Sequence, residues 1–519
     1  MTTRFTHLRL LVLALLIALL ALPATAFAQT KAGSAITIAQ GELPSSLDPP
    51  RDWAIASTWI HMNLFDCLVW RDRETMEFVP WLATSWENVD DRTWLMNLRE
   101  GVTFHNGEPF DAEAVVWTYE RIYTASRDQF ITFNQWTFIE SINVLGPYQV
   151  EFKTKTPDPA FLSRISGTGC GIQAPVAGRA MTPEDYVPIG TGPYEFVSYS
   201  RDEALVMKAN PNWFFGAPEI ETITWQSVPE ASTRVASLMT GAADLISAVP
   251  FQDWERINAN PGTSVTEYLT TQVMMLAMRS GANEQYPDYS GPTEDPRIRQ
   301  AIKYALDRET IIDVIDGLGV PTLTRITPPT LGSDPELYNT FGEYDPERSR
   351  ALLAEAGYDG EEITFHSSSS WINQRALSEV ITAMLQEVGL NVNLILMDTP
   401  SFREQIYFPY RNEELYLDAL GNSFFDPWIA VLSERGDRRE RSGWNGPQAT
   451  LVDALIRAAA ENMDPVEREA QYRQIARLIY DEAVFLPLYQ MIDAVGTSER
   501  LVWSPPQDGF FWMGNAKLQ

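Results

Sequence analysis

The residues that could act as nucleophiles, general bases or metal ligands are few in this 519-residue chain, and they are scattered. The four histidines are His7, His61, His105 and His366, and with only two cysteines they form no cluster with the spacing of a zinc site. His105 falls in a Phe-His-Asn-Gly turn, where we expect it to make hydrogen bonds rather than to serve as a base or ligand. These residues predict no metal site, no cofactor and no catalytic group.

Two glycine-containing segments resemble catalytic motifs only in part. Residues 421–425 (GNSFF) lack the final glycine of a nucleophile elbow. Residues 190–193 (GTGP) lack the length and the lysine of a phosphate-binding loop, and they predict a tight structural turn. Carboxylate pairs could support hydrolysis, but with 69 acidic residues the sequence does not single out one pair.

The two cysteines, Cys67 and Cys170, both lie in apolar surroundings. In an exported protein they are free to form a disulfide. Two buried free thiols are an equally good interpretation of the same surroundings. The sequence leaves this alternative open.

Composition limits the class of protein and its partners. The net charge of -30 disfavours contact with nucleic acid or with anionic lipid through charge alone. A chain of this length is too long for one ordinary core, so we expect two or more lobes.

The N-terminal residues predict export. Arg4 and Arg9 precede an apolar run over residues 10–22, which is too short to span a bilayer comfortably. Ala26-Phe27-Ala28 supplies the small residues of a cleavage site, so we expect residues 1–28 to be a signal peptide cut before Gln29. Because no cysteine lies near the cut, we expect a free periplasmic protein without membrane insertion.

The elements that would position any site alternate between strands and helices, which indicates an α/β fold. Strands are predicted at residues 35–39 and 149–153, and Asp-Pro pairs predict helix starts at Pro296, Pro346 and Pro465. Residues 363–396 read as strand, helix and strand, which predicts a βαβ unit with parallel strands.

Seven segments in order resemble family 5 of the extracellular solute-binding proteins, which includes dipeptide-, oligopeptide- and nickel-binding proteins. They are residues 42–49 (ELPSSLDP), 80–87 (PWLATSWE), 93–110 (TWLMNLREGVTFHNGEPF), 190–194 (GTGPY), 297–308 (RIRQAIKYALDR), 344–358 (YDPERSRALLAEAGY) and 485–489 (FLPLY). One such segment alone would be weak, whereas seven in the family's order behind an export signal are a specific match.

The resemblance implies a two-lobed α/β fold, the type II periplasmic-binding-protein fold of the cluster C kind, with an extra subdomain on lobe I. Mapped here, lobe I would take residues 30–61, 189–272 and 491–519, and the extra subdomain residues 62–188. Lobe II would take residues 273–490. Two chain crossings would form the hinge, at Thr271-Gln272 and at Gln490-Met491.

The implied function is binding and delivery, not catalysis. The chain would be a monomer that captures a peptide-like or other small organic solute and hands it to an inner-membrane ABC permease and its ATPase. Two alternatives are a secreted carboxylate-dependent hydrolase and a periplasmic sensor or chaperone on the same fold.

The expected ligand site is centred on residues 420–428 (LGNSFFDPW). In peptide-binding relatives an aspartate four residues before the proline of an Asp-Pro pair binds the ligand's amino group, and here Ser423 takes that place. The nearby acids are Asp418 and Asp426, so the amine anchor is expected to be missing. Phe424 and Phe425 would instead offer flat apolar surface.

Four further ligand contacts are expected from position alone. Trp53 follows the opening segment, and Trp371 lies at a strand-to-helix junction. Trp444 and Asn445 lie in a glycine-flanked loop.

Overall fold

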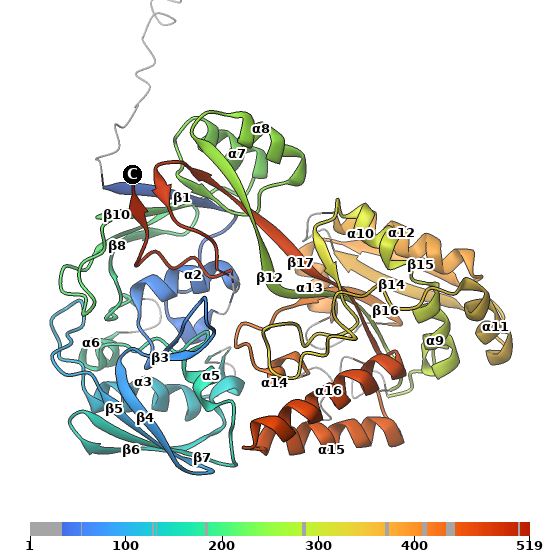
Figure 1. Ribbon diagram of the computed structural model, residues 1–519, viewed down its shortest axis with the longest axis horizontal. Coiled ribbons are helices and arrows are strands. Elements are labelled where there is room, and N and C mark those ends of the chain that lie inside the picture. The colour runs from blue at the N-terminus through green and yellow to red at the C-terminus, as the bar shows by residue number, and fades with distance from the viewer. Residues whose placement is uncertain are drawn as a thin grey trace, which may run out of the picture.

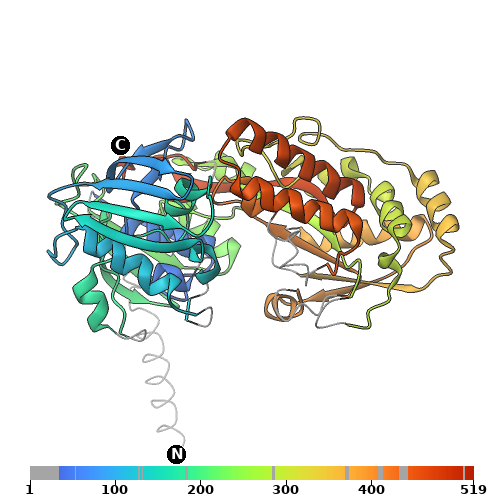
Figure 2. The same cartoon turned by 90° about the horizontal axis from the view of Figure 1, so that it is seen from below.

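The computed structural model describes residues 34–52, 54–126, 129–130, 132–181, 185–282, 287–368, 373–406, 413–431, 442–506 and 509–519. The predicted signal peptide lies outside the described residues, as do the predicted ligand residues Trp53 and Trp371. Within the described ranges, no helix is both long and apolar enough to cross a membrane. The described part of the chain forms two lobes that lie side by side and are joined by two long strands (Figures 1 and 2).

Lobe I is built on β1 (Ala35–Gln40), the strand that was predicted at residues 35–39. β1 runs parallel to β10 (Thr222–Ser227) and to β11 (Leu245–Ile246), which forces helical or long connections between them. The sheet continues antiparallel through β9 (Ala204–Ala209) and β8 (Tyr194–Ser200). Three helices pack on this part of the sheet: α2 (Ile55–Leu64), α7 (Ala231–Met239) and α8 (Trp254–Ala259).

A subdomain with its own sheet extends lobe I. Its four antiparallel strands, in spatial order, are β4 (Ala83–Asp90), β5 (Thr93–Leu98), β7 (Gln149–Thr154) and β6 (Ile139–Gly146). The helices beside it are α3 (Ala112–Tyr123), α4 (Phe133–Trp136), α5 (Phe161–Ile165) and α6 (Pro175–Ala180). Apolar side chains alternate along β7, where Val150 and Phe152 are fully buried, so the strand predicted at residues 149–153 is confirmed. A short hairpin of β2 (Val69–Arg71) and β3 (Phe78–Pro80) borders lobe II.

Lobe II contains the predicted βαβ unit. β14 (Glu362–Ser368) and β15 (Asn391–Met397) are parallel and are linked by α12 (Gln374–Glu387), which confirms the prediction. β16 (Leu415–Leu420) continues this part of the sheet. The other helices of the lobe are α9 (Pro296–Ala305), α10 (Arg308–Val314), α11 (Pro346–Ala356), α13 (Thr399–Ile406), α14 (Pro427–Ala430), α15 (Pro447–Glu461) and α16 (Pro465–Glu482).

The three predicted Asp-Pro helix starts are confirmed by their capping hydrogen bonds. Asp295 accepts from the backbone N–H of Arg297, and Asp345 from that of Arg348. Asp464 accepts from two backbone N–H groups at the start of α16. Each aspartate therefore satisfies donors that the helix itself leaves unpaired.

Two long strands carry the chain between the lobes. β12 (Thr263–Met278) and β17 (Phe485–Ser498) are antiparallel to each other; β12 runs from the lobe I sheet into the lobe II sheet, and β17 runs back (Figure 1). β13 (Gly319–Pro321) pairs with β17 on the lobe II side, and a small ribbon of β18 (Leu501–Val502) and β19 (Lys517–Leu518) follows. One formally continuous sheet thus spans two separately packed bodies.

Candidate functional site

A small cavity lies where the β2–β3 hairpin and α5 of lobe I face the loop before α14 of lobe II. Its volume is about 20 Å³, which is room for about one water molecule. Lobe I and the C-terminal segment supply Met62, Trp70, Arg71, Arg73, Ser163, Ser166, Gly167 and Phe510. Lobe II supplies Ser423, Phe424 and Phe425, so the structure brings these three predicted ligand residues to an interlobe cavity.

A second cavity of about 10 Å³ lies next to the strands that cross between the lobes. It is lined by Leu269, Thr271, Thr327, Pro328, Pro329, Thr330, Asn422, Phe425 and Gln490. Phe425 lines both cavities and so lies between them. The buried Asn422 donates to the Thr330 hydroxyl at 3.1 Å, while its own side-chain oxygen has no partner among the described residues.

A larger depression of about 700 Å³ lies on lobe II alone, between the start of α9 and the end of α11. It is open to solvent, and all the residues that line it belong to lobe II. Closure of the lobes would therefore not enclose a solute there, and we do not assign it as the site.

Phe424 packs directly across the lobe boundary. A Cβ atom added to Gly167 would lie 2.4 Å from Cδ1 of the Phe424 ring, which is far inside van der Waals contact. Glycine at this position therefore lets the ring seat against lobe I. The neighbouring Phe425 has φ 48°, a left-handed conformation that is rare for a bulky residue and that fixes the direction of the loop.

Arg71 ties the two lobes together through neutral groups. Its guanidinium donates to the Ser163 hydroxyl at 2.8 Å in lobe I and to the backbone carbonyl of Phe424 at 3.2 Å in lobe II. The same group lies 4.2 Å from the centre of the Phe78 ring and 5.8 Å from that of Phe425. Burial lowers the pKa of Arg71 to about 10, although the charge of Asp426 opposes this shift.

Arg73 adds a second positive charge to the same cavity. Its guanidinium lies 4.8 Å from the centre of the Trp70 ring and 5.8 Å from that of Phe510, in cation–π geometry. Burial and the neighbouring charge of Arg71 lower its pKa to about 9. The lining of the interlobe cavity thus combines two guanidinium groups with serine hydroxyls and aromatic rings.

The two acids near the loop before α14 are engaged elsewhere. Asp426 caps α14 and accepts from Arg468 at 2.7 Å. Asp418 lies buried in β16, and its carboxylate accepts from the backbone N–H of Ala419. Among the residues that the structure describes, neither cavity is lined by an acidic side chain.

A charged and aromatic cluster reinforces the contact between α5 and the lobe II helices. The Arg164 guanidinium lies 3.8 Å from the centre of the Trp428 ring across the boundary. Within its own lobe, Arg164 pairs with Asp158 at 2.9 Å. Burial lowers the pKa of Arg468, but its contact with Asp426 more than offsets this, so the net pKa of Arg468 is raised.

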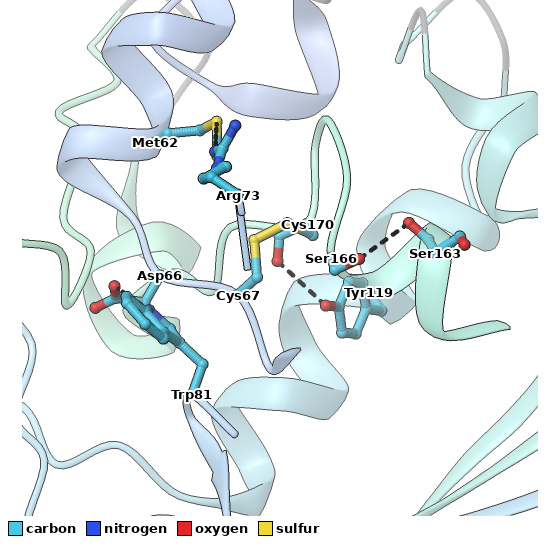
Figure 3. Close-up of a disulfide and its surroundings, with 9 residues drawn as sticks. All are labelled: Met62, Asp66, Cys67, Arg73, Trp81, Tyr119, Ser163, Ser166 and Cys170. Carbon is cyan, nitrogen blue, oxygen red and sulfur yellow. Dashed lines mark hydrogen bonds between the residues drawn. A yellow bond between two sulfur atoms is a disulfide. The ribbon is translucent and has the colours of Figure 1, made fainter. Parts of the chain in front are cut away.

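Cys67 and Cys170 form a disulfide, which settles the alternative that the sequence left open (Figure 3). Cys67 lies just before β2, which leads to Arg71 and Arg73, and Cys170 lies just after Gly167 and Ser166. Figure 3 shows the disulfide between Arg73 on one side and Ser166 on the other. The covalent bond therefore fixes two walls of the cavity to each other.

The pairing of β12 with β17 is interrupted at the point where the chain passes between the lobes. Leu269 pairs with Ile492 and Val273 with Gln490, so three residues of β12 face one residue of β17. Side chains fill the gap: Gln490 donates to the Thr270 carbonyl at 2.6 Å and accepts from Tyr338 at 2.8 Å. The predicted hinge residues Thr271, Gln272 and Met491 all lie in this irregular stretch, and Gln490 borders it.

Two predicted ligand residues are not brought to either cavity. Trp444 is buried in the lobe II core that contains Tyr416 and Val452, and Asn445 is exposed, with its amide bonded to the Gly443 carbonyl. The glycine-flanked loop instead packs its backbone against Gly281.

Sequence reasoning also missed residues, chiefly Arg71 and Arg73. Arg71 ends β2 and Arg73 lies two residues further on, so in an extended chain both side chains lie on the same side. This spacing was the one signal that the sequence offered.

Comparison with known proteins agrees with this architecture. A model of the bacterial extracellular solute-binding proteins, family 5, matches residues 77–433, more than half of the chain. The glutathione-binding protein of Salmonella paratyphi A is 25% identical over 98% of both chains. The nickel-binding periplasmic protein of Escherichia coli is 26% identical over 79% of this chain and 80% of its own.

Solved structures show the same fold. A dipeptide-binding protein from a Pseudoalteromonas species, in complex with Met-Leu, superposes with a TM-score of 0.81 at 20% identity, over 93% of this chain and 100% of its own. A periplasmic binding protein from Helicobacter pylori, in complex with a peptide, gives a TM-score of 0.79 at 22% identity, over 94% and 99%. The predicted two-lobed periplasmic-binding-protein fold is confirmed, and the chain belongs to family 5 of the bacterial extracellular solute-binding proteins.

Proposed function

We propose that this chain is the solute-binding subunit of an ABC importer, which captures a small organic or peptide-like solute between its lobes and delivers it to a permease and its ATPase. The observation that carries the proposal is that the walls of both cavities come from both lobes. A solute between such walls contacts both lobes only when they are closed, so its binding energy shifts the population toward the closed state. The names of the glutathione- and nickel-binding relatives support this function.

The lobes must separate to admit a solute. Cavities of about 10 and 20 Å³ cannot hold even a dipeptide, since small-molecule sites usually measure roughly 300–1,000 Å³. We place the hinge at Thr271, Gln272, Gln490 and Met491, where the pairing of the crossing strands is irregular. The lobe boundaries proposed with it are residues 30–61, 189–272 and 491–519 for lobe I, 62–188 for its subdomain, and 273–490 for lobe II.

We also propose a periplasmic location and binding without catalysis. The protein would act as a periplasmic monomer that releases its solute unchanged. A family description that names solute binding supports this, and so does the periplasmic location in the name of the nickel-binding relative.

A thermal-shift assay followed by mass spectrometry tests the proposal. The purified mature protein is heated with each member of a panel of glutathione, Met-Leu, nickel–histidine and agropinic acid. A solute at 100 times its dissociation constant should stabilise the protein by about 2.7 kcal/mol and be recovered intact. Conversion of the stabilising compound would contradict the proposal in favour of a hydrolase. Absence of a stabilising compound, both in this panel and in an extract of soluble metabolites, would contradict solute binding itself.

A further inference from the structure

Asn422 brings a buried hydrogen-bond acceptor to the smaller interlobe cavity. It follows β16 and lines the cavity beside the crossing strands, and only 4% of its surface is exposed. Its amide nitrogen donates to the Thr330 hydroxyl at 3.1 Å, but its side-chain oxygen, Oδ1, has no partner among the residues that the structure describes. A buried acceptor without a partner costs free energy, because it has given up its hydrogen bonds to water.

The other polar groups of Asn422 are already engaged. Its backbone N–H donates to the Thr271 carbonyl at 3.2 Å, and its backbone carbonyl accepts from the Phe425 N–H at 3.1 Å. Together with the bond to Thr330, these contacts leave Oδ1 as the one polar atom of this residue that another molecule could pair. The bond to Thr271 also joins the loop before α14 to the crossing strand β12, which places Asn422 at the proposed hinge.

An unpaired oxygen does not by itself mark a ligand site. The amide oxygens of Gln40 and Gln135 are also buried without a partner among the described residues, but neither residue lines a cavity between the lobes. Gln490, the other amide side chain of the smaller cavity, uses both of its polar atoms in hydrogen bonds within the protein. Asn422 therefore combines an unpaired acceptor with a position in a wall of the interlobe space.

The wall around Asn422 carries no charge. Within the described part of the chain, no acidic or basic side chain lines this cavity, and the other lining residues are Leu269, Thr271, Thr327, Pro328, Pro329, Thr330, Phe425 and Gln490. An ammonium group enclosed here would lose its water without gaining a carboxylate. An amide N–H or a hydroxyl O–H loses far less on burial and can be satisfied by a single acceptor.

We propose that the solute carries an uncharged N–H or O–H group, as an amide or a hydroxyl does, and that this group donates a hydrogen bond to Oδ1 of Asn422. This inference rests on the proposed solute-binding function and specifies one contact and the chemical class of the group that makes it. Phe425 lines both interlobe cavities. A solute held between the lobes can therefore extend past the Phe425 ring from the larger cavity to Asn422.

Calorimetric titration of three variants tests this contact. The probe is the compound that the immobilised mature wild type retains from a bacterial metabolite extract, identified by mass spectrometry. Asn422→Leu nearly keeps the size of the side chain and removes the acceptor, whereas Asn422→Asp replaces the amide by a group that only accepts. Asn143→Leu, at an exposed asparagine of β6 that lines neither cavity, is the matched control. Circular dichroism and thermal unfolding check that each variant is folded.

We expect the wild type and Asn143→Leu to bind the retained compound with equal affinity. Asn422→Leu should weaken binding about 10-fold or more, because the donor of the solute is then buried without a partner. Asn422→Asp should weaken binding far less, because one carboxylate oxygen still accepts from the solute and the other can accept from the Thr330 hydroxyl. Once the donor of the solute is methylated, Asn422→Leu should weaken binding no further.

The results that would overturn the inference are distinguishable. An affinity that Asn422→Leu leaves unchanged would show that the protein binds a solute without this contact. An equal loss in Asn422→Asp and Asn422→Leu would show that the solute presents an acceptor, and a clear gain in Asn422→Asp would show that its donor is an ammonium group. Retention of no compound by the wild type would contradict the solute-binding function and this inference together.

Discussion

At the scale of single residues, Gly167 decides how closely the lobes approach. Substitution by alanine would place a Cβ atom 2.4 Å from the Phe424 ring, and such overpacking typically costs about 1–3 kcal/mol. Because the clash with Phe424 exists only in the closed state, we expect solute affinity to fall about 5- to 150-fold. The new Cβ also lies 3.1 Å from the Ser163 carbonyl within lobe I, so the unfolding temperature of the ligand-free protein should fall slightly as well.

The matched control for Gly167→Ala is Gly146→Ala, since a Cβ at Gly146 meets no atom within 4 Å. Calorimetric titration of both variants makes the comparison. An affinity for Gly167→Ala equal to that of the control would show that Phe424 does not need this contact for closure.

Asp66 gives the stability of lobe I a specific pH dependence. It is fully buried and accepts hydrogen bonds from Trp81 at 2.7 Å and Thr191 at 2.9 Å, yet burial outweighs them and raises its pKa from 3.8 to about 6. Between these values the folded state binds more protons at this carboxyl than the unfolded state does. Ionised Asp66 therefore destabilises the fold above pH 6, and this cost disappears as the pH falls toward 4.

The comparison of wild type with Asp66→Asn isolates that contribution. Relative to the variant, the wild type should gain roughly 3 kcal/mol of unfolding free energy between pH 7.5 and pH 4, as measured by denaturant titration. Parallel pH profiles for the two proteins would contradict the raised pKa.

Individual residue contacts were the hardest part to predict. The structure brings Ser423, Phe424 and Phe425 to an interlobe cavity, just before the Asp-Pro pair that starts α14, and their contact with a solute stays a prediction. The position of Arg71 at this cavity was not predicted, because its contact with Phe424 joins positions 353 residues apart. Trp444 was misplaced because an aromatic in a glycine-flanked loop serves a core as readily as a cleft.

At the scale of elements, the disulfide joins the segment before β2 to the loop after α5. It closes a loop with a sequence separation of 103, and constraint of the unfolded chain by such a loop contributes roughly 4 kcal/mol. We expect reductant to lower the unfolding free energy of the wild type by about this amount, and to have no effect on the Cys67→Ala, Cys170→Ala double variant. A wild type that unfolds identically with and without reductant would show that the bond adds no stability.

Helices and strands were well predicted where local signals are strong. Asp-Pro caps set the starts of α9, α11 and α16, and alternating burial sets β1 and β7. The pairing of the two cysteines was not predictable in the same way, because a disulfide depends on two segments meeting in space. Local apolar surroundings describe a buried thiol and a buried bridge equally well.

At the scale of the whole molecule, the proposed closure depends on the two lobes, the crossing strands and the interlobe cavities together. The pairing of β12 with β17 is interrupted between Leu269 and Val273, where the chain passes between the lobes, and again between Met274 and Met275. We propose that the first interruption is where the crossing strands bend. Closure is held by Phe424 against Gly167, by Arg71 on the Phe424 carbonyl and by Arg164 on Trp428. The ordered family segments predicted the two lobes and the strands that cross between them. The small volume of the interlobe cavities was not predicted, because it depends on how the two lobes are placed relative to each other.

Small-angle X-ray scattering of the mature protein, with and without the solute that it retains, tests the central claim most directly. The account predicts that the ligand-free protein has a larger radius of gyration than the closed arrangement described here, and that saturating solute reduces it to the closed value while the solute is recovered unchanged. A radius of gyration that does not change on binding, or a solute that is consumed, would contradict closure of two lobes around an intact ligand.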